Sequence, residues 1–196
     1  MSDTIAAIAT GAARSAIGIL RLSGPGSLAA VERLFTPVSG KKLGDYPVST
    51  LVYGVLRDEQ GRVIDQCLAV YTRGPHSYTG EDTVEIQCHG SPAVLSAGLE
   101  ALFTAGARPA GRGEFTKRAF LHGQLDLTQA EAVIDLIEAE TADAAANAAG
   151  QVGGSLQKQL APAYDLLTDI CSHFHAVLDY PDEDIADFRL DRKSVV

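Results

Sequence analysis

The stretch "HGQLDLTQAEAVIDLIEA", His122 to Ala139, separates two parts of the chain that have different sequence patterns. Of the 19 glycines, 16 lie before residue 125 and 3 lie after it. Turn residues therefore dominate the first part, whereas apolar residues at three- and four-residue spacing dominate the second. We expect two structural regions, 1–121 and 122–196, that meet at this stretch.

The formal net charge of −9 is concentrated in the second region. Residues 1–124 hold 12 Lys and Arg against 11 Asp and Glu, whereas residues 125–196 hold 4 against 14. The acidic second region should repel a phosphate backbone. This distribution disfavours a simple RNA-binding module.

Other global features indicate a cytoplasmic protein. No run of about 18 apolar residues is present, so we expect no membrane span. The N-terminus has an acidic residue at Asp3 and no basic segment, which argues against a secretory signal. Cys67, Cys88 and Cys171 are widely spaced and form neither a CxxC pair nor a disulfide framework.

The first region predicts a mixed α+β domain. In "AIGILRLS" (16–23), Arg21 alternates onto the same face as Ile17 and Ile19. Further strands are expected at 49–56, 63–72 and 83–88, with a glycine turn at Gly61 between the first two of these. Two helices are expected to begin after N-caps at Ser27 and Ser91.

The second region predicts an incomplete all-α bundle. Thr128 and Glu131 match a T-x-x-E capping box before one helix over 132–149. A second helix should start or kink at Pro162 and end at Pro181. Each helix would expose an apolar stripe, so another element must complete the bundle.

Two residues in the first region leave alternatives open. Arg21 could reach solvent or a structural carboxylate, or it could bind a planar ligand group. Glu85, opposite in orientation to Val84 and Ile86, could be an ordinary solvent-facing residue. It could instead accept two parallel N–H bonds from a heterocycle such as guanine or a pterin. The alternation alone does not decide between these interpretations.

Other sequence features exclude some kinds of site. The chain contains no GxxxxGK[ST] and no GxGxxG, so we do not expect it to hydrolyse GTP on its own. His173 and His175 are two residues apart on a predicted helix and do not share a face, and we expect no metal site.

Four stretches together resemble the bacterial tRNA modification GTPase (MnmE/TrmE) family. They are "DTIAAIATGAARSAIGILRLSG" (3–24), "GPHSYTGEDTVEIQCHGSP" (74–92), "RPAGRGEFTKRAFLHGQLDLTQAEAVIDLI" (108–137) and "LDYPDEDI" (178–185). The resemblance covers nearly the whole chain and matches the N-terminal half of the family. It implies a folate-binding, aminomethyltransferase-like α+β domain followed by the first helices of a helical domain. The G domain, with its GTP, Mg²⁺ and K⁺, and the C-terminal helices would be absent from this chain.

The resemblance also implies a ligand and partners. Family members are homodimers through the N-terminal domain and bind 5-formyltetrahydrofolate or a related tetrahydrofolate. With an FAD-dependent partner (MnmG/GidA), they modify C5 of the wobble uridine of certain tRNAs, and the full-length protein is a GTP hydrolase. Alternatives are a free-standing folate-dependent aminomethyl or formyl transferase, and an assembly module that binds no folate.

The resemblance assigns the folate contacts to three positions. These are Arg21, Glu85 and Gln124, where the last stands in place of the lysine that is usual in the family. We also expect the loop "GRGEFTKRAF" (111–120) to contribute Arg112, Lys117 and Arg118 to the anionic side of the ligand. The alternatives for this loop are a connector with solvated charges and a structural ion pair between Arg118 and Glu114.

Overall fold

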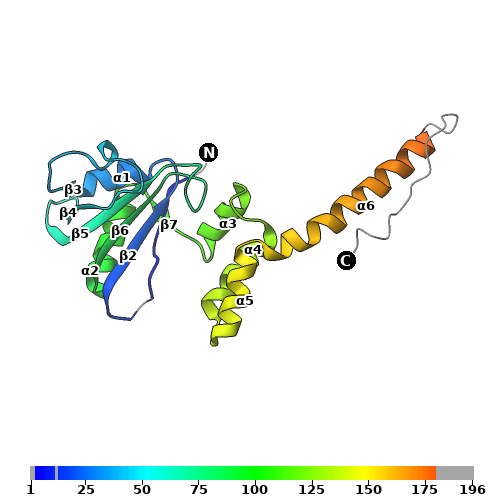
Figure 1. Cartoon of the computed structure of the whole chain (residues 1–196). Coiled ribbons are helices and arrows are strands. Elements are labelled where there is room, and N and C mark those ends of the chain that lie inside the picture. Colours follow the sequence, from blue (N-terminus) through cyan, green and yellow to red (C-terminus); the bar gives the residue numbers. More distant parts are fainter. Residues whose placement is uncertain (1–2, 12, 180–196) are drawn as a thin grey trace. The chain divides into compact units, whose positions relative to one another are not determined.

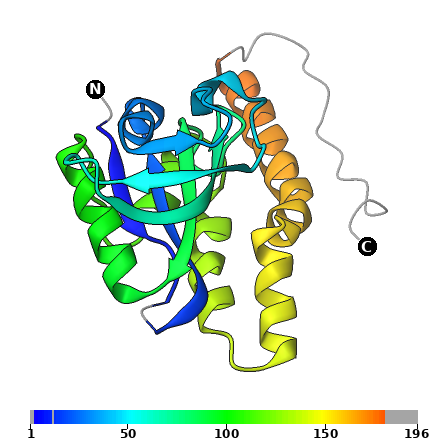
Figure 2. The ribbon, with the colours of Figure 1, turned by 90° about the vertical axis from the view of Figure 1, so that its left-hand side faces the viewer.

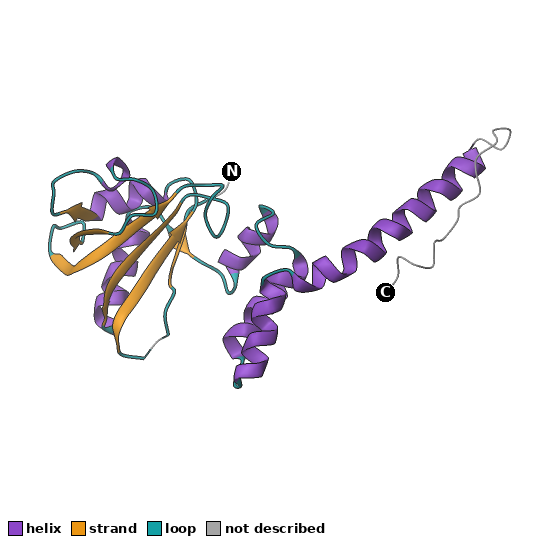
Figure 3. Ribbon diagram, viewed as in Figure 1, coloured by secondary structure: helices purple, strands orange, loops and turns teal. Residues whose placement is uncertain are grey.

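The computed structural model describes residues 3–11 and 13–179. They form two compact units, divided between Ala130 and Glu131. All the described strands lie in the first unit, and the described part of the second unit is helical (Figure 3). A mixed sheet with helices, followed by a helical region, confirms the expected fold class.

The first unit is built on a seven-stranded mixed sheet with the strand order β3-β4-β5-β6-β2-β1-β7 (Figure 1). Adjacent strands pair antiparallel except β1 and β7, which pair parallel. The expected turn between β4 and β5 is present, and Gly61 has a φ of 80°, which glycine adopts without steric cost. The strands are β1 (Ile5–Ile8), β2 (Ser15–Ser23), β3 (Phe35–Pro37), β4 (Val52–Arg57), β5 (Val63–Thr72), β6 (Thr83–Gly90) and β7 (Arg108–Pro109).

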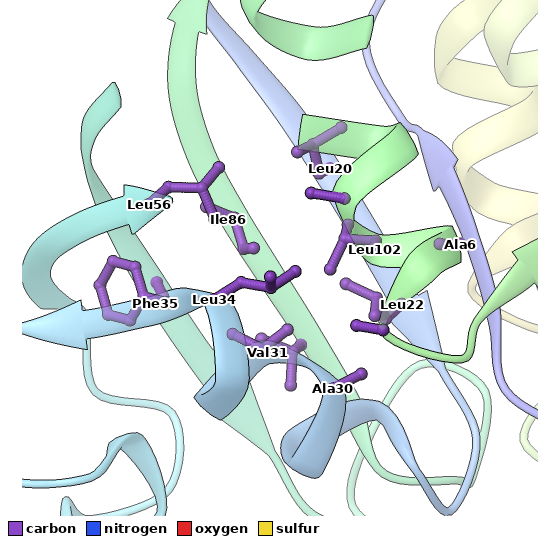
Figure 4. Close-up of a cluster of buried hydrophobic side chains, with 14 of the residues drawn as sticks. Ala6, Leu20, Leu22, Ala30, Val31, Leu34, Phe35, Leu56, Ile86 and Leu102 are labelled. Carbon is purple, nitrogen blue, oxygen red and sulfur yellow. The ribbon is translucent and has the colours of Figure 1, made fainter. Parts of the chain in front are cut away.

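One face of the sheet is covered by α1 (Ser27–Leu34) and α2 (Pro92–Thr104) (Figures 1 and 2). Alternate residues of β2 and β6 face these helices, as the period of two in "AIGILRLS" predicts. Figure 4 shows several of the apolar side chains that fill the space between sheet and helices. The fully buried members of this core include Leu20, Leu22, Val31, Leu34, Phe35, Leu56, Val84, Ile86 and Leu102.

The predicted N-caps of α1 and α2 are only partly correct. Ser27 is the first residue of α1 rather than its cap, and its hydroxyl donates a hydrogen bond to the Asp82 carbonyl at 2.9 Å. Ser91 does occupy the N-cap position of α2, as expected, and Pro92 is the first helical residue. Its side chain, however, makes no capping hydrogen bond.

Besides α1 and α2, the structure has more helices than the two that the sequence predicted for the second region. They are the 3₁₀ helix η1 (Leu43–Asp45) and the α-helices α3 (Glu114–Leu121), α4 (Leu127–Glu138), α5 (Ala142–Val152) and α6 (Ser155–Asp179). The single helix expected over 132–149 is two helices, because Thr141 is the N-cap of α5 and accepts a hydrogen bond from the Ala144 N–H. Pro162 lies inside α6 rather than at its start. Pro181 lies outside the described residues.

The cap of α4 is also different from the predicted one. Asp126 Oδ1 accepts hydrogen bonds from the Gln129 N–H at 2.8 Å and from the Thr128 hydroxyl at 2.7 Å. Gln129 Oε1 in turn accepts from the Asp126 N–H at 2.9 Å. The capping box is therefore Asp126 with Gln129, and the predicted pair of Thr128 with Glu131 is wrong.

Arg118 is the centre of an ion-pair network in the first unit. Its side chain is only 8% exposed, and it pairs with Glu81 at 2.8 Å, Asp3 at 2.7 Å and Glu114 at 3.1 Å. The structural ion pair with Glu114 that the sequence allowed is therefore present. Arg108 also binds Glu114 through two nitrogens, at 2.6 and 2.9 Å, and pairs with Asp3. The network joins α3, the segment before β1, β7 and the loop before β6.

The network shifts the titration of its members. Hydrogen bonds from Arg108 are the main reason why the pKa of Glu114 falls to about 2, and the same is true of Asp3. Burial alone would lower the pKa of Arg118, but its hydrogen bonds to Glu81 and Glu114 outweigh burial and raise it.

No helix among the described residues has the length and hydrophobicity needed to cross a bilayer.

The close packing of Gly54 against β3 gives a first prediction. A Cβ at Gly54 would lie 2.4 Å from Phe35 Cζ and 2.6 Å from the Thr36 carbonyl oxygen. We expect Gly54→Ala to destabilise the protein by about 1–3 kcal/mol, measured as a lower urea midpoint by circular dichroism. Gly11→Ala is the control, because no atom of the described residues lies within 4 Å of its Cβ position, and we expect an unchanged midpoint. Equal midpoints for both variants would contradict the packing described.

The lowered pKa of Glu114 gives a second prediction. A carboxyl whose folded pKa is depressed stabilises the protein above its unfolded pKa, about 4.3, and loses that contribution as pH falls towards the folded value. We therefore expect the urea midpoint to fall between about pH 4.5 and pH 2, and to fall less steeply in Glu114→Gln. Glu100→Gln, which changes an exposed residue of α2, should keep the wild-type slope. Identical slopes for all three proteins would exclude this role of Glu114.

Candidate functional site

The strand register places Arg21 of β2 directly opposite Glu85 of β6. Because their neighbours Leu20, Leu22 and Ile86 face the helices, both side chains lie on the other face of the sheet. Arg21 Nε donates a hydrogen bond to Glu85 Oε1 at 2.6 Å. The two residues that the sequence left open thus form one ion pair.

The ion pair of Arg21 and Glu85 uses only part of their hydrogen-bonding capacity. Within the part of the chain that the structure describes, the two Nη atoms of Arg21 and Oε2 of Glu85 have no hydrogen-bond partner. The side chains are 30% and 26% exposed, so these groups are accessible from outside. A guanidinium offers five N–H donors in one plane, and four of them belong to the Nη atoms. The pair can therefore bind a planar group that presents donors and acceptors along one edge.

Two aromatic side chains lie next to Arg21. The guanidinium carbon is 5.7 Å from the ring centre of Tyr78 and also 5.7 Å from that of Phe115. The Tyr78 hydroxyl lies 3.0 Å from Thr116 Oγ1, which joins the loop between β5 and β6 to α3. The sequence did not predict either aromatic residue as part of a site. The available signal was an aromatic residue within each of two glycine-rich stretches, "GPHSYTGED" and "GRGEF".

Gln124 is held against the same loop. His122 Nδ1 lies at hydrogen-bonding distance, 2.7 Å, from the Thr79 carbonyl oxygen. A Cβ on Gly80 would lie 3.3 Å from Cγ and 3.4 Å from Nε2 of Gln124, so the glutamine side chain packs closely on the backbone at Gly80. One short loop segment, 78–80, thus contacts Arg21 through Tyr78 and Gln124 through Gly80.

The stretch 111–120, expected to be a loop, is largely helix α3, and its cationic residues Arg112, Lys117 and Arg118 line a cavity of about 480 Å³. Arg112 and Lys117 are exposed, and neither forms an ion pair with any described residue. Arg118 also lines this cavity, but its guanidinium is already bound to three carboxylates. Arg112 and Lys117 therefore have free charges here, while Arg118 shapes the cavity wall. The other lining residues are Gly111, Glu114, Leu121 and His122.

The described residues contain no group of three or more His, Cys, Asp or Glu side chains arranged to hold a metal ion. The groups described above offer hydrogen bonding by Arg21 and Glu85, aromatic contact by Tyr78 and Phe115, and attraction of anions by Arg112 and Lys117. Such a set suits a flat, polar ligand with an anionic extension.

Comparison with known proteins gives two adjacent family matches. Residues 4–124 match the family described as GTP-binding protein TrmE N-terminus, and residues 127–194 match the MnmE helical domain. Together these matches cover nearly the whole chain.

Individual relatives are similar over the same range. The tRNA modification GTPase MnmE of Clostridioides difficile (strain 630) is 47% identical over 185 residues, 94% of this chain and 40% of the relative. The protein of the same name from Symbiobacterium thermophilum is 48% identical over 92% of this chain and 39% of the relative. That from Aquifex aeolicus (strain VF5) is 45% identical over 94% and 40%. The chain thus spans about two fifths of the length of these relatives. It belongs to the MnmE/TrmE family of tRNA modification GTPases and consists of that family's N-terminal and helical domain segments.

Proposed function

We propose that this chain is the tetrahydrofolate-binding, dimerising part of a tRNA modification GTPase. The observation that carries the proposal is the half-used ion pair of Arg21 and Glu85, which joins two residues that the family resemblance assigns to the folate. One carboxylate oxygen and two guanidinium nitrogens stay available beside each other. The amide and amine edge of a pterin supplies the complementary donors and acceptor.

The remaining candidate residues suit the other end of a folate. The glutamyl part of a folate carries carboxylates. Lys117 of α3 and Arg112, just before this helix, are exposed cations that could bind them. Gln124 packs on the loop segment that also carries Tyr78, and this proximity supports its assignment to the ligand. When bound, 5-formyltetrahydrofolate or a related tetrahydrofolate would supply a one-carbon unit.

The activity of the longer protein is proposed from the family. In that proposal, the protein acts with an FAD-dependent partner (MnmG/GidA) to modify C5 of the wobble uridine of certain tRNAs in the cytoplasm. Its GTP hydrolysis would require a G domain with Mg²⁺ and K⁺. The chain contains no GxxxxGK[ST] stretch, so we assign GTP hydrolysis to the longer protein and not to this chain.

The central test is calorimetric titration of the chain with 5-formyltetrahydrofolate. We expect Glu85→Ala and Arg21→Ala each to weaken binding by roughly tenfold to a hundredfold, because each removes a charged hydrogen-bond partner worth about 1.5–3 kcal/mol. His89→Ala is the control, since His89 is an exposed residue of the same strand whose ring binds Asp65. Sedimentation of the same samples should show a dimer at tens of micromolar. No heat with the wild type at millimolar ligand would leave an assembly module as the better description.

The glutamine at position 124 gives a gain-of-function prediction. Gln124→Lys restores the residue that is usual in the family, and a charged donor to a carboxylate is stronger than a neutral one by roughly 1 kcal/mol. We expect fivefold to tenfold tighter folate binding, with less gain at high salt because screening weakens exposed ion pairs. Gln124→Met should lose affinity. Equal affinity of the lysine, glutamine and methionine forms would remove Gln124 from the site.

A further inference from the structure

Tyr78 and Phe115 place aromatic surface where a ligand on Arg21 and Glu85 would lie. The rings come from separate elements, the loop between β5 and β6 and helix α3, yet both contact one guanidinium at the same distance. Neither residue belongs to the hydrophobic core, and Tyr78 is 41% exposed. Aromatic surface that does not fill a core is available for stacking on a ligand.

The hydrogen-bond geometry of Arg21 indicates how a bound heterocycle would be oriented relative to these rings. A flat heterocycle bound to the Nη atoms of Arg21 and the free oxygen of Glu85 lies nearly in the plane of the guanidinium, because guanidinium N–H bonds point outward in that plane. A ring positioned over the guanidinium therefore extends over the adjoining edge of the heterocycle.

We propose that Tyr78 and Phe115, here called the aromatic walls, determine the specificity of this site for the flat pyrimidinone part of a reduced pterin. The inference rests on the proposed folate function and adds to it a requirement for two rings. Arg21 and Glu85 read the edge of the heterocycle, and the aromatic walls exclude ligands that are not flat. The Tyr78 hydroxyl lies 3.0 Å from Thr116 Oγ1, so the loop and the helix that carry the two rings also contact each other.

A purely structural role makes a different prediction. If the rings only position Arg21, their removal should weaken a pterin-containing ligand in the wild type but cost no further affinity in an Arg21→Ala background. If they contact the pterin, their removal should weaken a pterin-containing ligand in both backgrounds and leave a fragment without the pterin unaffected. The two ligands to compare are 5-formyltetrahydrofolate and p-aminobenzoylglutamate, which shares only the anionic part.

The experiment measures both dissociation constants for the full chain, the fragment by competition. We expect Tyr78→Ala and Phe115→Ala each to weaken 5-formyltetrahydrofolate roughly threefold to tenfold without changing p-aminobenzoylglutamate. Phe115→Leu, which keeps apolar volume but loses the flat ring, should behave like Phe115→Ala. Tyr78→Phe and Phe115→Tyr should retain affinity because each keeps a ring.

Matched controls separate the aromatic walls from general effects. Tyr53→Ala removes another half-exposed tyrosine from strand β4 of the same sheet, and we expect wild-type affinity for both ligands. Urea midpoints of all variants identify any that fail to fold. If an alanine variant fails to fold, the affinities measured for Phe115→Leu decide whether the flat ring is required. Wild-type binding with an unchanged affinity ratio in Phe115→Leu would overturn this inference alone. Absence of wild-type binding would overturn the proposed folate function as well.

Discussion

The antiparallel pairing of β2 with β6 holds the core and the candidate site in one register. Leu20 is opposite Ile86 and Leu22 is opposite Val84, and all four side chains are fully buried. The rung between them brings Arg21 and Glu85 together on the other face. A shift of one residue in either strand would move charged groups into the core, at a cost of several kcal/mol. Hydrophobic packing therefore selects the geometry of the ion pair.

The sheet could be predicted from the sequence because a period of two is a strong local pattern. Strand β2 and the glycine turn at Gly61 follow directly from that pattern. The helix ends could not be predicted equally well, since several polar side chains compete for the same backbone groups. Asp126 with Gln129 and Thr128 with Glu131 both match a capping box, and the sequence does not show which pair binds. Thr141 likewise ends one run of helix formers by capping the next helix.

Some residues of the candidate site could likewise be predicted from the sequence, and others could not. Arg21 and Glu85 could be suggested because each is a polar residue in an apolar strand, and the family resemblance then assigned their role. Tyr78 and Phe115 could not be predicted in this way. Their contact with Arg21 depends on how the loop between β5 and β6 and helix α3 pack against the sheet. The sequence places Arg118 beside Arg112 and Lys117 as a ligand contact, and it also allows the structural ion pair with Glu114 that the structure shows. Two of its three carboxylate partners, Asp3 and Glu81, come from distant segments, so only the folded chain shows the full set that makes this arginine structural.

The network around Arg118 has a consequence for the order in which the chain folds during its synthesis. Arg118 is 115 positions from Asp3, to which it donates hydrogen bonds through both terminal nitrogens. Asp3 therefore gains these partners only after nearly all of the sheet-containing unit has been synthesised. Contacts of such long sequence separation form late and slow the folding of the unit that contains them. The sheet must therefore assemble its strands without the pair of Asp3 and Arg118, which can form only after helix α3 has been synthesised.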